Sequence, residues 1–232
     1  MKSFISTNSS KLLFLGLALL ASFTSCDKDE VVVPPADLSN VLVVHASPNA
    51  PGVDLLVDDQ KVNSSALVYP TNTGYLSVNA GTRNVKVNVA GTSTTVINAN
   101  LPFLKDGNYS LFAVDSVSKI SAILLSDDLT APASGKAHVR FVHLSPDAPA
   151  VDVAVTGGGV VFNNISFKNG TSFTPLDAGT YNLEVRVAGT STVALPLPGI
   201  ALSAGKIYTV FAKGFLGGSG AQALGAEIII NK

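Results

Sequence analysis

The sequence predicts an all-β protein built from two tandem β-sandwich domains, immunoglobulin-like or similar in type. The first observation behind this prediction is a repeat, because the motif His45–Asp54 returns 98 positions later as His143–Asp152. The second is composition, since the chain is rich in Val, Thr, Ser, Asn and Gly, the residues of strands and turns. The third is that no amphipathic helical stripe follows the N-terminal apolar run. A constant displacement over such a distance indicates two copies of one structural unit.

The repeat also divides the chain. Two further matches keep the same displacement, because Ala80–Thr82 aligns with Ala178–Thr180 and Ala90–Thr94 aligns with Ala188–Thr192. A short stretch with one proline separates the two copies, and it is expected to restrict their relative orientation. The predicted segments are a signal peptide at 1–25, a tether at 26–39, a first β-sandwich at 40–129, a linker at 130–135 and a second β-sandwich at 136–232.

Hydrophobic alternation locates the clearest strands. Val85, Val87 and Val89 alternate with polar residues, so one side of this strand packs and the other meets water. The second repeat shows the same alternation over 182–187. Prolines close the strand that precedes each copy of the motif. In the first repeat the expected strands are 41–44, 53–57, 75–78, 84–89, 109–114 and 120–125.

Charge and cysteine content exclude two classes of protein. The net charge is −1, from 15 basic and 16 acidic residues, and the basic residues form no stripe. Because nucleic-acid binding depends on neutralising phosphates, we expect no nucleic-acid partner. Cys26 is the single cysteine, so no internal disulfide can form and stability must come from packing.

The N-terminal segment predicts a membrane address. Lys2 and Lys11 precede the apolar stretch 12–21, which is too short to span a bilayer comfortably. Small polar residues then lead to Ser25-Cys26, and this arrangement resembles a bacterial lipoprotein signal, in which the cysteine is lipidated after cleavage. The alternative is an ordinary secretory signal cleaved nearby. The lipid on Cys26 is the expected link to the membrane.

The residues behind this cysteine refine the predicted location. Asp27–Glu30 resembles the surface-export signal of Bacteroidetes lipoproteins, although a solvated charge run in a tether has the same composition. Residues 31–36 have the composition of an extended, polyproline-like spacer. We therefore expect a protein lipid-anchored in the outer membrane and facing the cell exterior.

The repeated motif resembles one bacterial family. A strand that ends in His is followed by Ser-Pro-x-Ala-Pro-x-Val-Asp and then by an Ala-Gly-Thr hairpin leading into alternating Val, in both repeats. This pattern is similar to the family called domain of unknown function 4397, which occurs in secreted and surface proteins, often as repeats. The resemblance implies an all-β extracellular domain, and it supplies no catalytic residue or substrate.

The motif also offers the first chemical candidates. A His–Asp pair could orient a base or bind a metal. However, each His stands at the end of the apolar face of its strand, whereas the alternation in the next strand directs each Asp away from the core. We therefore expect a buried, hydrogen-bonded His and an Asp that satisfies turn amides. The motif residues expected to be structural are His45, Ser47, Pro48, Asp54, His143, Ser145, Pro146 and Asp152.

Other candidates are weaker still. Ser219 lies in a glycine-rich stretch that faintly resembles a nucleophile elbow, but no His follows it. Asp58–Asp59 and Asp127–Asp128 lack the spacing of a calcium site and are expected to be solvated turn acids. Asp115-Ser116-Val117 resembles the Bacteroidetes O-glycosylation site, which makes Ser116 a modification candidate. We expect no catalytic, cofactor or metal site.

Three hypotheses for function remain. The favoured one is a non-catalytic surface protein with a binding, adhesive or scaffolding role toward a surface protein or glycan. The second is a glycan-binding component of a polysaccharide-uptake system, which requires exposed rings for sugar stacking. The third is a hydrolase with an unrecognised site. The rings available to the second hypothesis are Tyr69, Tyr75, Phe103, Phe162, Phe167 and Phe173.

Overall fold

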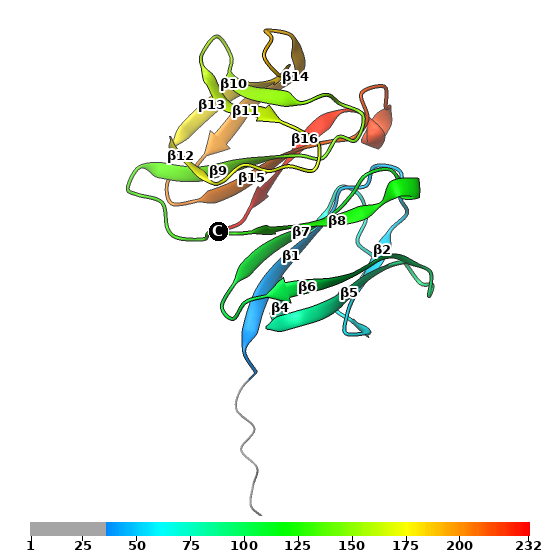
Figure 1. The fold of residues 1–232 in the computed structure, drawn as a ribbon. Helices are drawn as coiled ribbons and strands as arrows, with labels where there is room; N and C mark the ends of the chain where they lie inside the picture. The colour runs from blue at the N-terminus through cyan, green and yellow to red at the C-terminus, as the bar shows by residue number, and fades with distance from the viewer. Residues whose placement is uncertain (1–35) are drawn as a thin grey trace, which may run out of the picture. The chain divides into compact units, whose positions relative to one another are not determined.

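A computed structural model describes residues 36–232, which form one compact unit built almost entirely from β-strands (Figure 1). Within this range the only helical elements are two single turns of 3-10 helix, η1 (Val117–Lys119) and η2 (Gly220–Gln222). The all-β prediction is therefore confirmed. No helix among these residues has the length and hydrophobicity to cross a membrane.

The first repeat folds into two four-stranded sheets. Sheet A has the order β4-β1-β7-β8, with β1 parallel to β7 and the other pairs antiparallel, and sheet B has the antiparallel order β3-β2-β5-β6. The strands of sheet A are β1 (Leu38–His45), β4 (Asn72–Asn79), β7 (Asn108–Val114) and β8 (Ser121–Ser126). Those of sheet B are β2 (Val53–Val57), β3 (Gln60–Lys61), β5 (Gly81–Val89) and β6 (Thr95–Phe103).

The second repeat has the same topology. Sheet C has the order β12-β9-β15-β16, with β9 parallel to β15, and sheet D has the order β11-β10-β13-β14. The strands of sheet C are β9 (Lys136–His143), β12 (Thr174–Asp177), β15 (Ile207–Lys213) and β16 (Gly225–Ile230). Those of sheet D are β10 (Val151–Val155), β11 (Val160–Ile165), β13 (Gly179–Val187) and β14 (Val193–Leu202).

Each repeat has its own core between its two sheets. In the first repeat Val41 and Val43 of β1 pack against Val85 and Val87 of β5, as the alternating pattern predicted. The second core is built from the equivalent strands, with Val139 and Phe141 of β9 in the places of the β1 valines. Burying such side chains stabilises each sandwich by about 1.5–3 kcal/mol per residue.

A third hydrophobic cluster joins the two repeats. Leu42 and Val44 lie on the face of sheet A opposite its own core, and they pack with Val142 of sheet C. Sheets A and C are therefore covered on both faces, so the sheets stack in the order B-A-C-D. The sequence predicted two sandwiches and a linker, but it did not predict this shared layer. The buried members of the cluster are Leu42, Val44, Ala46, Phe112, Val114, Val142, Leu144, Phe211 and Ile229.

Equivalent residues of the two repeats meet in this layer. Phe112 of β7 and Phe211 of β15 occupy the same position in their repeats, and their rings contact edge to face with centroids 6.1 Å apart. The contact therefore resembles the two-fold interface of a homodimer, formed here within one chain.

Candidate functional site

The motif histidines are fully buried, and both nitrogens of each ring are hydrogen-bonded. The Nε2 atom of His45 lies 2.9 Å from the carbonyl oxygen of Pro51, and its Nδ1 accepts from the Ser47 amide at 3.4 Å. His143 repeats this arrangement, with distances of 2.9 Å to Pro149 and 3.3 Å from Ser145. Burial lowers the pKa of each imidazole, so each ring is held neutral.

The motif serines link the end of one strand to the next hairpin. The Ser47 hydroxyl donates to the carbonyl oxygen of Asp115 at 2.6 Å, and the Ser145 hydroxyl donates to that of Gly214 at 2.7 Å. Both hydroxyls are buried. Pro48 and Pro146 each begin the turn that follows the serine. The motif serine thus fastens the β7–β8 connection to the end of β1 in the first repeat. In the second repeat it fastens the β15–β16 connection to the end of β9.

The motif aspartates bind turn amides and do not contact the histidines. Asp54 accepts from the Gly91 amide at 3.0 Å and pairs with Lys61 at 2.7 Å, and these contacts lower the pKa of its carboxyl. Asp152 accepts from the amides of Gly189 at 2.8 Å and Asn164 at 2.6 Å. Within the described part of the chain, no hydrogen bond or ion pair joins either histidine to either aspartate. These contacts favour the structural interpretation of the motif.

The structure does not bring the remaining catalytic and metal candidates together into a site. Among residues 36–232 no three His, Cys, Asp or Glu side chains are grouped as a metal site would require. Asp58 and Asp59 are exposed turn residues that pair with Arg83 and Lys86. Ser219 is exposed in the β15–β16 connection, just before η2.

Asp127 departs from the expectation that it is a solvated turn acid. Its side chain is completely buried, and it forms an ion pair of 2.7 Å with the equally buried Arg140 of the second repeat. The reason is the shared A–C layer, which covers the end of β8. Arg140 also donates to Thr209 and Ser110, both at 2.8 Å.

Two further side chains complete this buried polar cluster. Tyr75 donates to the Asp127 carboxylate and accepts from the Asn231 amide, so it touches both repeats. Burial, followed by the bond to Asp127, raises the pKa of the Tyr75 phenol well above its ordinary value. Sequence reasoning missed the cluster. The signal that could have found it is the repeat alignment, in which Arg140 stands where the first repeat has Leu42.

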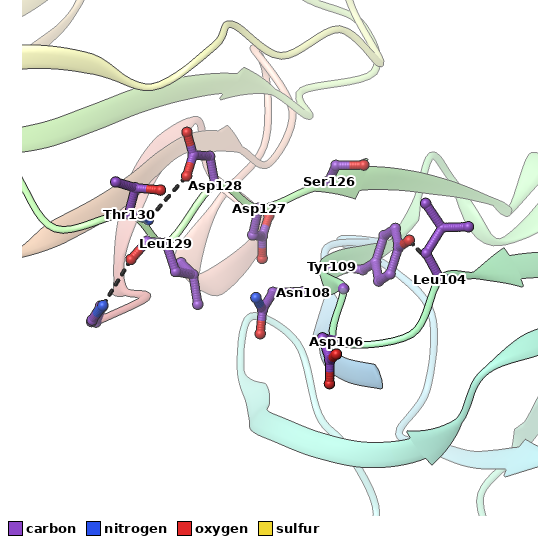
Figure 2. Close-up of a pocket in the computed structure, with 11 residues that line it drawn as sticks. Leu104, Asp106, Asn108, Tyr109, Ser126, Asp127, Asp128, Leu129 and Thr130 are labelled. Atoms are coloured by element: carbon purple, nitrogen blue, oxygen red, sulfur yellow. Dashed lines mark hydrogen bonds between the residues drawn. The ribbon is translucent and has the colours of Figure 1, made fainter. Parts of the chain in front are cut away.

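An open groove lies at the same end of the first repeat (Figure 2). It has a volume of about 780 Å³ and runs along the turn 104–109, residues 126–130 and Lys232. The Lys232 ammonium donates to the Leu129 carbonyl oxygen at 2.8 Å. Asp106 and Asp128 place carboxylates on its wall, and Leu104 is 71% exposed. The groove therefore offers acceptor oxygens beside the apolar side chains of Leu104 and Leu129.

No aromatic residue among the described residues is fully exposed. Phe103 and Phe162 are buried in the two cores. Tyr69 and Phe167 pack edge to face on the motif histidines. Phe173 lies half-buried beneath the Arg140 guanidinium, which is 4.5 Å from its ring centroid. Tyr75 belongs to the buried polar cluster, so none of the six rings that sugar stacking would need is exposed.

The two modification candidates differ in what the structure describes. Cys26, the predicted lipidation site, lies outside the described residues. Ser116 precedes η1 and is half-buried, and its amide donates to the Asp115 carboxylate at 2.8 Å. Asp115 is itself paired with Lys168 of the second repeat at 2.9 Å. The predicted O-glycosylation triplet is therefore partly engaged in contacts between the repeats.

Comparison with known proteins identifies a family. The sequence matches the family described as Domain of unknown function (DUF4397) twice in tandem, over residues 39–154 and 155–227. No curated protein matches the sequence. The first match extends past β8 into β10, whereas the structural repeat ends at the connection between β8 and β9. Because the two matches cover most of the chain, the protein belongs to the DUF4397 family as a tandem repeat.

Proposed function

We propose that this protein is a lipid-anchored protein of the outer cell surface with a non-catalytic binding, adhesive or scaffolding role. The observation that carries the proposal is the open groove of Figure 2, which combines exposed acceptor oxygens with the exposed Leu104. The shared A–C layer supports the proposal because it fixes one wall of the groove, residues 126–130, against the second repeat. A fixed surface loses less conformational entropy when a partner binds.

The two other hypotheses have less support. Glycan capture by ring stacking needs exposed aromatic side chains, and all the aromatic residues among 36–232 are buried or half-buried. Hydrolysis with a motif histidine as the base would need a free ring nitrogen, but both ring nitrogens of His45 and of His143 are bonded within the motif. The proposal therefore assigns the groove to a protein partner.

The first experiment measures binding directly. Residues 36–232 contain all three hydrophobic clusters and form one compact unit, so they can be tested as a soluble fragment. This fragment is passed over immobilised matrix proteins and, in parallel, polysaccharides. Saturable protein binding that is weakened by Leu104→Ser and by Asp128→Asn supports the proposal. Val160→Ser, which changes another exposed apolar residue on β11, is the matched control. Binding to polysaccharides alone would instead promote the glycan hypothesis.

The second experiment tests the anchor. The variant Cys26→Ala in the full-length chain should move the protein from the membrane fraction to the soluble fraction. Protease treatment of intact cells should degrade the parent protein if it faces the exterior. Retention of Cys26→Ala in membranes would contradict lipidation at this residue.

A further inference from the structure

The second repeat contains a cavity with an entirely apolar wall. Its volume is about 170 Å³, and it lies between the core of the repeat and the β15–β16 connection. His143 lies in the wall, but both of its ring nitrogens are bonded to the motif backbone, so it contributes only carbon to the lining. The side chains that shape the cavity are Val151, Val185, Val187, Ala194, Leu195 and Leu216.

The first repeat carries a larger side chain at one position of the equivalent place. Val96 in β6 occupies the position that Ala194 holds in β14, as the strand pairing with β5 and β13 shows. Ile97, which pairs with Val87 of β5, is buried. Its counterpart Leu195, which pairs with Val185 of β13, is only half-buried. Ile120 packs against the core of the first repeat. A larger residue at position 96 and the deeper burial of Ile97 thus distinguish the first repeat from the second.

The connection above the cavity also differs between the repeats. In the first repeat β7 and β8 are joined by residues 115–120, and in the second β15 and β16 are joined by the longer stretch 214–224. The longer connection places Leu216 over the cavity while leaving that side chain 49% exposed. A Cβ added at Gly217, the next residue, would meet open space. The cavity therefore borders solvent on the side of Leu216.

The wall determines which occupants are suitable. A buried water needs two to four polar partners, which this lining does not provide. A sugar or an amino acid would bury its polar groups without hydrogen bonds. An apolar cavity of about 150 Å³ in another protein stays dry and binds benzene or xenon. The volume here suits one aromatic ring or a branched alkyl group of similar size.

The geometry points to a binding site in the second repeat for a small apolar molecule, of the size of a substituted benzene, beneath Leu216. This site is separate from the groove of Figure 2, and it does not depend on the proposed surface role. The first repeat lacks the Ala194 side of the site because Val96 stands there.

The test uses toluene and isobutylbenzene as probes of the 36–232 fragment, with leucine and valine methyl groups observed by NMR. We expect saturable shifts at methyls of Val151, Leu195 and Leu216. The variant Ala194→Val, which introduces the residue of the first repeat, should weaken binding by about tenfold or more because it fills the cavity. Ala194→Leu should abolish it. Thermal unfolding of both variants is the check that they remain folded.

The matched control is the opposite exchange in the first repeat. Val96→Ala should leave the affinity at the second-repeat methyls within about twofold, because the two positions lie in separate cores. The proposal is overturned if no probe gives saturable shifts at these methyls. It is also overturned if folded Ala194→Val binds the probes as tightly as the parent protein does.

Discussion

Replacing Arg140 and Asp127, singly and together, is the strongest test of how the two repeats are joined. The variant Arg140→Leu introduces the residue of the equivalent position in the first repeat, and Asp127→Asn introduces that of the second. The two groups form a buried ion pair of 2.7 Å, with side chains 2% and 0% exposed. The pair is therefore shielded from solvent and from salt.

Each single variant leaves a buried charge without its partner. Arg140→Leu also removes the hydrogen bonds to Thr209 and Ser110, each 2.8 Å long, while the Asp127 carboxylate stays buried. Removing one member of a buried pair costs about 3–5 kcal/mol, and we expect this loss of unfolding free energy for each single variant. The double variant leaves no unpaired charge, so we expect it to cost less than either single change.

The assay is urea unfolding of residues 36–232 followed by far-ultraviolet circular dichroism, because the chain contains no tryptophan for fluorescence. The control is Asp177→Asn, which breaks the exposed pair with Lys136 and should change stability by less than about 1 kcal/mol. Additive losses, with the double variant costing the sum of the single ones, would refute the reasoning, because they would mean that the two charges do not interact.

Three further predictions concern the motif and the shared layer. Because burial lowers the pKa of both motif histidines, the unfolded state binds protons that the folded state does not. The free energy of unfolding, measured with urea, should not change above about pH 7 and should fall as the pH drops below about 6.5. The fall should be smaller in His143→Gln. Ser145→Ala leaves a buried carbonyl unpaired and should cost about 1–3 kcal/mol by the same assay, whereas the exposed Ser191→Ala should cost almost nothing. Gly170→Ala would place a methyl group 2.9 Å from Cδ1 of Leu125 in the other repeat and 3.2 Å from Cγ2 of Val142. Because the flexible Leu125 side chain can move aside, we expect a small fall in the melting temperature, whereas Gly159→Ala meets open space and should cause none; equal melting temperatures would contradict this packing.

Part of the fold could be predicted from the sequence because it depends on local patterns. Val85, Val87 and Val89 alternate with polar residues, which identified β5 as a strand with one buried face. The constant displacement of the motif identified the repeat. The polar edge strand β3 has no such alternation, and the burial of β1 on both faces gave no indication of what covers its second face.

The polar cluster and the cavity depend on contacts between distant segments. Asp127 follows a strand and precedes a proline-containing linker, so its surroundings in the sequence are those of an exposed turn. It is buried only because the second repeat packs over it. At the cavity, Ala194 stands where the first repeat has Val96. The effect of this difference on packing can be judged only when the strands of the two repeats are aligned in the structure. Neither the polar cluster nor the cavity is marked by a motif in the sequence.

The meeting of equivalent residues in the A–C layer has a consequence for how these repeats choose partners. Two copies of the first repeat joined in the same way would bury two Asp127 carboxylates facing Leu42 side chains, with no cation. Two copies of the second would bury two Arg140 guanidinium groups with no carboxylate. Only the mixed pair brings Arg140 to Asp127. Each repeat therefore fits the other better than it fits a second copy of itself, so the buried charges disfavour the pairing of like repeats.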